Sequence, residues 1–306
     1  MRTLDRSLLA ELARHTSEGI TERAFHLDVE GDRLFALLTE PAAPVPGNDL
    51  GFVVVHSFGL EVLTLRRSER GMARALAAAG HPVLFVHRRG FGDSDGDPEA
   101  ATLQRQLADL HVARDHLLSA TAARRVGLIG ARFGGLLAGV LAREGGVERL
   151  ALVQPAVTGA RWTRSFIREM HVVRMTDPVG RDRRGTDELA EMRRNGVLDV
   201  LGYGLPATLH DALQEIDLAG DMGSFAGDSL VVQVAKRPTL AKDLEALRDR
   251  LAAAGRCRAE VIREPAGSTF GSASFVATTG ELHVRTDVME PVVAELGRLI
   301  VGWATE

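Results

Sequence analysis

Short apolar runs alternate with helical stretches along most of the 306-residue chain. The apolar runs span residues 51–55, 82–86, 126–129, 150–153, 230–234 and 259–262, and helical patterns cover 70–79, 103–120, 133–143 and 240–254. Uninterrupted apolar strands that alternate with helices are typical of a parallel sheet with helices on both faces. The sequence therefore predicts an α/β fold in which a mostly parallel central sheet is flanked by helices.

Two further patterns lie outside this alternation. The sequence predicts an antiparallel hairpin at the edge of the sheet, formed by residues 24–29 and 33–38 and joined at Glu30-Gly31-Asp32. Residues 292–303 predict a last helix that packs on the sheet.

One long interval interrupts the alternation. Residues 158–227 are helical and charged, with no convincing strand, and we interpret them as a helical cap inserted into a core of residues 1–157 and 228–306. From Arg161 to Arg194 there are nine arginines, no lysine and six carboxylates. This local positive excess is either a solvated helical surface or a positively charged roof over a site.

Composition narrows the class of protein. The net charge of −4 argues against wholesale nucleic-acid binding. Cys257, the single cysteine, excludes an internal disulfide and fits a reducing cytoplasm, where we interpret it as a structural or surface thiol. No run is long enough to span a bilayer. Near the start, Leu8, Leu9 and Leu12 resemble one face of a short helix, and residues 1–14 lack the apolar stretch of a signal peptide.

The pentapeptide Gly130-Ala131-Arg132-Phe133-Gly134 lies between an apolar run and a helical pattern. Strand, tight turn and helix in this order are the context of the Gly-x-Ser-x-Gly nucleophile elbow, with arginine in place of serine. A guanidinium stays protonated up to a pH above about 12, so it cannot attack a carbonyl as serine does. Ordinary serine hydrolysis at position 132 is therefore excluded.

Two more segments resemble the α/β-hydrolase superfamily over nearly the whole chain. His56-Ser57-Phe58-Gly59 is similar to the turn that lends backbone to the oxyanion hole, and His87-Arg88-Arg89-Gly90-Phe91-Gly92-Asp93-Ser94 is similar to a frequent Asp-x-Arg-Gly-x-Gly-x-Ser segment, with histidine for aspartate. Within the superfamily the elbow and Leu201-Gly202-Tyr203-Gly204-Leu205 resemble exosortase A system-associated hydrolases, in the neighbourhood of serine aminopeptidase-like esterases. The resemblance implies an α/β-hydrolase fold with a cap and little about chemistry.

The resemblance also implies where the other members of a catalytic triad would lie. The acid usually follows the strand at 230–234, but no carboxylate occurs there until Asp243, inside a predicted helix. His283 precedes the last helix and is a candidate for the histidine; the alternative is a surface or strand histidine in an insertion at 267–286. Serine and acid are thus both missing from their expected positions.

Arg132 would project beside the amino-terminal end of a helix, where free N–H groups carry partial positive charge. A carboxylate, phosphate or enolate could bind there between the guanidinium and the N–H of Phe133. The alternative is that Arg132 forms an ion pair with an internal acid, Asp93 or Glu61, and that this pair fills a pocket that no longer has a function.

Other side chains around this position are candidates for chemistry or binding. His56 is a candidate acid or base, or a brace for its loop, and Ser57 is a candidate nucleophile or oxyanion donor. His87 is expected to support the site without catalysing. Phe58, Phe133, Trp162 and Tyr203 are expected to contact the substrate. Metal-ligand spacings and phosphate-binding loops are missing from the sequence, so we expect no metal and no cofactor.

Three functions follow. The first is a noncanonical enzyme that uses Arg132 to hold a carboxylate- or phosphate-bearing substrate, such as an acyl-carrier- or coenzyme A-linked group in a biosynthetic pathway. The second is an inactive pseudohydrolase that binds a small molecule or a partner. The third is an esterase or thioesterase in which Ser57 or Ser274 works with His283. We expect a cytoplasmic protein, and the sequence leaves a homodimer open.

Overall fold

The computed structural model describes residues 14–17, 19–176, 187–264, 270, 274–278, 281–285 and 290–306. Its centre is a sheet of nine strands: β1 (Arg14–Ser17), β2 (Ile20–Val29), β3 (Asp32–Pro41), β4 (Leu50–Val55), β5 (Val83–Val86), β6 (Arg125–Ala131), β7 (Arg149–Val153), β10 (Asp228–Ala235) and β11 (Arg256–Arg263). Their order across the sheet is β1-β2-β3-β5-β4-β6-β7-β10-β11. From β5 to β11 all neighbours are parallel, so the predicted mostly parallel sheet is confirmed.

The predicted hairpin is also present, as β2 and β3. Glu30 and Gly31 form its turn, and both have positive φ angles, 52° and 95°. Two residues in this conformation match the twist of the flanking strands. β1 pairs antiparallel with β2 and forms the outer edge, beyond the predicted hairpin. The helix predicted near Leu8 and Leu12 lies outside the described residues.

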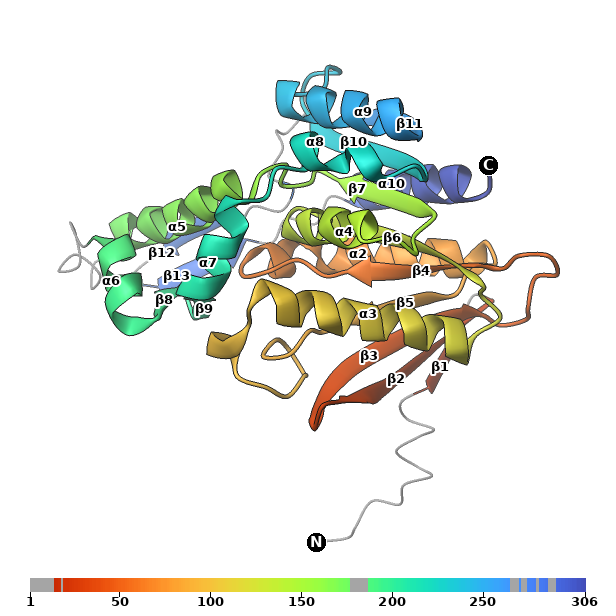
Figure 1. Cartoon of the computed structure of the whole chain (residues 1–306), viewed down its shortest axis with the longest axis horizontal. Coiled ribbons are helices and arrows are strands. Elements are labelled where there is room, and N and C mark those ends of the chain that lie inside the picture. The colour runs from red at the N-terminus through yellow and green to blue at the C-terminus, as the bar shows by residue number, and fades with distance from the viewer. Residues whose placement is uncertain are drawn as a thin grey trace, which may run out of the picture.

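Helices cover both faces of the sheet (Figure 1). α2 (Glu61–Ala78) and α10 (Glu290–Ala304) pack on one face, and α3 (Leu103–Ala120), α4 (Phe133–Arg143) and α9 (Lys242–Ala254) pack on the other. One core joins Leu65 and Leu296 to Phe52 of the sheet, whereas the other gathers Leu110 and Leu136. This layering leaves the carboxyl ends of the parallel strands at one edge of the sheet, where loops can build a site.

α2 begins nine residues earlier than the sequence pattern predicts, at Glu61 instead of residue 70. The buried face of its first half includes Glu61, Val62, Leu65 and Glu69. Two buried glutamates interrupt the apolar period that marks a helix in the sequence. Both glutamates have partners in the candidate site described below.

A long segment separates β7 from β10. It contains α5 (Gly159–Thr176), α6 (Glu188–Asn195), β8 (Val197–Val200), β9 (Tyr203–Pro206), α7 (Ala207–Gln214), α8 (Leu218–Asp221) and the 3-10 helix η3 (Met222–Ser224). Thr158 and Asp217 form an isolated bridge that brings two distant parts of the insertion together. The division at residues 158 and 227 remains our proposal.

The expectation of no strand in this insertion is wrong, because β8 and β9 form an antiparallel pair. Their turn consists of Leu201 and Gly202, both with positive φ. Leucine rarely adopts this conformation, and four-residue strands are too short for a clear alternation of polar and apolar residues. The sequence therefore carried no usable hairpin signal there.

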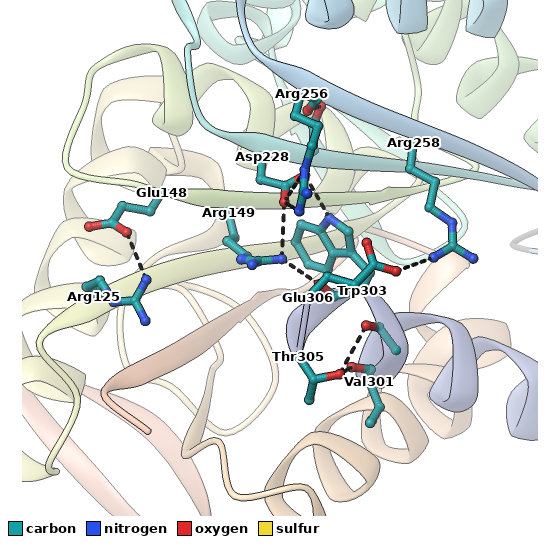
Figure 2. Close-up of polar contacts among 12 residues, drawn as sticks. Arg125, Glu148, Arg149, Asp228, Arg256, Arg258, Val301, Trp303, Thr305 and Glu306 are labelled. Atoms are coloured by element: carbon teal, nitrogen blue, oxygen red, sulfur yellow. Dashed lines mark hydrogen bonds and ion pairs between the residues drawn. The ribbon is translucent and has the colours of Figure 1, made fainter. Parts of the chain in front are cut away.

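A polar network fastens the last helix to the amino-terminal ends of the strands (Figure 2). The carboxylate of Asp228 accepts hydrogen bonds from Trp303 Nε1 at 3.2 Å and Arg256 Nε at 3.0 Å, and it pairs with Arg149 Nη1 at 3.2 Å. Arg149 also donates to the carbonyl oxygen of Trp303. This network lies at the opposite edge of the sheet from the elbow, which fits a structural role.

The remaining described elements lie near the carboxyl terminus. β12 (Ser274–Thr278) and β13 (Glu281–Arg285) form a separate two-stranded antiparallel sheet. Cys257 lies within β11, not between a helix and a strand, and burial raises the pKa of its thiol, which makes it a poor nucleophile. Of the helices in the described part of the chain, not one combines the length and apolar character needed to cross a membrane.

Candidate functional site

Arg132 occupies a strained turn between β6 and α4. Its φ and ψ angles are 52° and −119°, a conformation that few non-glycine residues adopt. The flanking glycines are required by close backbone contacts. A Cβ at Gly130 would lie 2.3 Å from the carbonyl oxygen of Gly134, and one at Gly134 would lie 2.1 Å from that of Val55. The backbone therefore makes a sharp turn from β6 into α4, with Arg132 at its tip.

The carboxylate of Glu61 lies directly against this tip and accepts hydrogen bonds from four donors. Its Oε2 accepts from the backbone N–H of Phe133 at 3.1 Å and from Ser57 Oγ at 2.5 Å. Its Oε1 accepts from Arg132 Nε and Trp162 Nε1, both at 3.2 Å. Glu61 is the first residue of α2 and is 3% exposed. Four donors from three segments of the chain thus converge on one buried carboxylate.

The Arg132 side chain therefore pairs with an internal acid, Glu61, as one of the two sequence interpretations expected. Asp93, the other acid considered, contacts His87 instead, with 3.5 Å between Oδ2 and Nδ1. Only Nε of Arg132 is engaged; within the described part of the chain its terminal nitrogens make no hydrogen bond. Arg132 also lines a polar cavity of about 230 Å³, together with Gln154 and Gln233.

His56 and Ser57 are both completely buried behind the elbow. His56 Nδ1 lies 2.9 Å from the carboxylate of Glu69, and its Nε2 has no hydrogen-bond partner among the described residues. Ser57 directs its hydroxyl to Glu61, while its N–H donates to Glu69 at 3.3 Å. Among the described residues, the partner of the Ser57 hydroxyl is therefore a carboxylate and not a histidine.

His87 and Arg88 hold the neighbouring loop. His87 Nδ1 accepts from the N–H of Asp93 at 3.1 Å, and burial with the nearby charge of His56 lowers the pKa of His87 to about 3. The buried Arg88 donates to the carbonyl oxygens of His56 and Ser57 at 2.6 and 3.2 Å. Burial lowers the pKa of Arg88 to about 10, so it is cationic at neutral pH. These contacts agree with the supporting role expected of His87.

His283 is the candidate histidine of a triad, and Asp243 is the first carboxylate after β10. His283 lies in β13 opposite Val276, and its side chain lies outside the described part. Asp243, in the first turn of α9, forms an ion pair with Arg161. Arg161 and Asp243 both line the polar cavity, so the positive charge expected of the cap is neutralised at this point.

Of the four residues expected to contact a substrate, two line a second cavity, Trp162 lines the polar cavity with Arg132, and Phe133 is completely buried. Phe58 and Tyr203 line a cleft of about 430 Å³ between the core and the insertion. Phe133 and Trp162 are 0% and 3% exposed, with ring centroids 4.3 Å apart. Their polar N–H groups, not their ring faces, contribute to the site through Glu61.

Sequence reasoning missed Glu169 of α5. Burial and the negative charge of Glu61 raise its pKa to about 7, although Arg132 acts in the opposite direction. Nothing in the sequence distinguishes Glu169 from other glutamates on a charged helix, because its environment depends on how α5 packs on the elbow. No group of three potential metal ligands occurs in the part of the chain that the structure describes.

Comparison with solved structures places this geometry in a known fold. The chain is similar to Est1E from Butyrivibrio proteoclasticus with ferulic acid bound, with a TM-score of 0.63 and 18% identity over 92% of this chain and 100% of that one. A proline iminopeptidase from Mycobacterium smegmatis gives a TM-score of 0.56 and 16% identity over 92% of this chain and 99% of that one. An alpha-beta serine hydrolase homologue from Coxiella burnetii gives 0.54 and 14%, over 92% and 96%.

No protein-family model matches the chain, and no protein of curated function is similar to it in sequence. The structural neighbours have the α/β-hydrolase fold and are mostly esterases and peptidases. At such low identity they show the fold of this chain and not its reaction. The chain therefore has a hydrolase-like α/β fold.

Proposed function

We propose that this protein is a pseudohydrolase, which binds a small molecule in an α/β-hydrolase scaffold without hydrolysing it. The observation that carries the proposal is the position of the Glu61 carboxylate. In a serine hydrolase of this fold, the N–H after the nucleophile stabilises the oxyanion of the tetrahedral intermediate. Here that N–H, of Phe133, is hydrogen-bonded to Glu61.

The internal carboxylate opposes hydrolysis in two ways. It uses the backbone donor that would stabilise an oxyanion, and its own negative charge would repel one at the same place. It also accepts the hydrogen bond of the Ser57 hydroxyl. Both effects support a site built to hold its own acid instead of a reacting ester.

An enzyme that acts on an anionic substrate is the second candidate, and two observations favour it. Arg132 lines the polar cavity, and its terminal nitrogens make no hydrogen bond within the described residues, so they could hold a carboxylate or phosphate, for example of an acyl-carrier- or coenzyme A-linked group in a biosynthetic pathway. Glu169, with a pKa near 7, has the acidity of a general acid–base catalyst. No serine is needed in this mechanism.

Activity-based labelling separates these proposals from hydrolysis at a displaced serine. We expect no labelling of the wild-type protein by a fluorophosphonate probe and no turnover of 4-nitrophenyl esters. Labelling at Ser57 or Ser274 would contradict the pseudohydrolase and favour the third function. Intact-protein mass spectrometry detects the adduct, and Ser57→Ala and Ser274→Ala variants identify the residue.

A thermal-shift panel of carboxylates and phosphates tests the second candidate. If Arg132 holds an anionic substrate, Arg132→Ala should abolish a shift seen with the wild-type protein, because a lost bidentate contact costs about 1.5–3 kcal/mol. Arg164→Ala, which removes an exposed arginine of α5 that does not line the polar cavity, is the control. A shift that persists in Arg132→Ala would exclude this role.

A further inference from the structure

We infer that the cleft between the core and the insertion binds an organic monocarboxylate with an aromatic or acyl body, whose carboxylate pairs with Arg66. The inference rests on the proposed function and names its ligand class and its binding place. The cleft holds about 430 Å³, within the range of about 300–1,000 Å³ typical of small-molecule sites. Arg132 is not among its lining residues, so this site differs from the anion position beside the elbow.

Aromatic side chains from the core and the insertion form the apolar part of the cleft. Phe91 and Tyr203 stack with ring centroids 6.3 Å apart and an interplanar angle of 18°, and Phe58 lies 6.3 Å from Phe91. The first residue of β9 is Tyr203, and β9 contacts the 3-10 helix η1 (Pro98–Ala100), whose Pro98 also lines the cleft. Such walls favour a flat or extended apolar body.

Leu63 extends this apolar surface. It lines the cleft and is 45% exposed, one of three large hydrophobic side chains that are exposed among the described residues. An exposed leucine alone needs no explanation, but one that borders an aromatic cleft adds apolar surface for a ligand to cover.

The charge of the cleft is positive. Its lining includes Arg66, Arg88 and Arg89 and no aspartate or glutamate. Arg89 is neutralised by Asp109 and Glu30, at 2.9 and 2.7 Å. An organic cation would therefore find no carboxylate on these walls, whereas an anion would find a guanidinium.

Arg66 is the guanidinium available to a ligand. Arg88 directs its donors to two carbonyl oxygens and to Gln106, deep in the protein. Arg66 is exposed on α2 and makes no hydrogen bond or ion pair with any residue that the structure describes. Its charge acts across the cleft, because it opposes the rise that burial causes in the pKa of Tyr203. One free guanidinium beside an apolar cleft matches a monoanion with an apolar body.

Isothermal titration calorimetry with 4-phenylbutyrate and its neutral analogue 4-phenylbutanamide tests the inference on the full chain. We expect the carboxylate to bind at least about tenfold more tightly than the amide, and Arg66→Gln to remove that difference. Arg67→Gln is the matched control, because Arg67 is the next residue of α2, pairs with Glu290 and does not line the cleft. Tyr203→Ala should weaken both ligands, and Tyr203→Phe should not.

Other results would overturn the inference. Equal affinity for acid and amide, no binding of 4-phenylbutyrate at millimolar concentration, or unchanged binding by Arg66→Gln would each do so. Loss of binding in Arg132→Ala but not in Arg66→Gln would place the anion at the elbow and leave the pseudohydrolase proposal intact. Ester turnover by the wild-type protein would contradict that proposal, whatever the titrations show.

Discussion

At position 132 the chain has a strained backbone turn between β6 and α4, with an arginine side chain at its tip. A φ of 52° in a non-glycine residue costs free energy. In a nucleophile elbow, the same strained conformation exposes the reactive side chain. Here the exposed side chain is a cation, and Glu61 sits where it meets both the guanidinium and the helix N–H. The paired charges stabilise each other, so the two residues depend on one another.

The first prediction concerns this dependence. Glu61→Gln removes the charge that faces Arg132 while it keeps one acceptor oxygen. Because an uncompensated, partly buried guanidinium is left behind, we expect the free energy of unfolding to fall by about 2 kcal/mol or more. Urea unfolding of the single variants and of Glu61→Gln with Arg132→Met measures the coupling. A double variant as unstable as the sum of the two singles would show that the pair is not coupled.

The second prediction concerns pH and Glu169. The pKa of Glu169 is about 7 in the folded protein, above the ordinary value of 4.5. Between pH 4.5 and pH 7, the folded protein therefore holds a proton on Glu169 that the unfolded chain has lost. The contribution of Glu169 to stability therefore falls as pH rises from about 4.5 to 7 and is constant above that. Glu169→Gln should be more stable than wild type at pH 8, by on the order of 1–3 kcal/mol, and equal to it near pH 4.

Thermal or urea unfolding at several pH values measures this difference. Glu215→Gln, at an exposed position of the insertion, is the matched control and should show no such pH-dependent gain. A constant difference between Glu169→Gln and wild type from pH 4 to pH 8 would mean that Glu169 does not titrate in this range.

At the scale of elements, two glycines let β6 and α4 cross the neighbouring strand. Gly130 contacts the backbone of Gly134, and Gly134 contacts the backbone of Val55 in β4. Main-chain atoms of packed strands cannot move aside, in contrast to the end of a flexible side chain. The sequence spacing of these glycines predicts the turn, because only glycine permits such close passage.

The third prediction follows from this contact. A methyl group at Gly134 would lie 2.1 Å from the carbonyl oxygen of Val55, so Gly134→Ala should destabilise the protein by about 3 kcal/mol or more, or prevent folding. Gly145→Ala is the control, because Gly145 has a φ of 98° and no atom within 4 Å of the added methyl. Its cost should be limited to the backbone term of about 1 kcal/mol. Similar soluble yields and melting temperatures for both variants would contradict the prediction.

At the scale of the whole molecule, the carboxyl ends and the amino ends of the parallel strands have different roles. The carboxyl ends of the strands lead into the elbow, the His56–Ser57 turn and the cleft under the insertion. The amino ends are fixed to α10 by Asp228, Arg149 and Trp303. Changes at sites that share no partner add independently.

The fourth prediction tests that separation. Asp228→Asn weakens the contacts with Arg149, Arg256 and Trp303, and we expect it to lower the free energy of unfolding by about 1–3 kcal/mol. The affinity for 4-phenylbutyrate should stay within twofold of wild type, which corresponds to a change of about 0.4 kcal/mol in the binding free energy. Chemical unfolding and calorimetry on the same preparation measure both quantities. A large change in affinity would show that the two edges are coupled.

The sequence by itself determined the layered α/β fold, the positions of α3 and α4 and the elbow around Arg132. These features are local, since apolar periodicity and glycine spacing are written in consecutive residues. The tertiary structure alone decided which acid meets Arg132, because the sequence offered both Asp93 and Glu61 and the partner depends on how α2 packs on the sheet. It also decided that the β8–β9 hairpin brings Tyr203 to Phe91 and that Arg66 borders their cleft. Such contacts join residues far apart in the chain, so only the packing of whole elements fixes them.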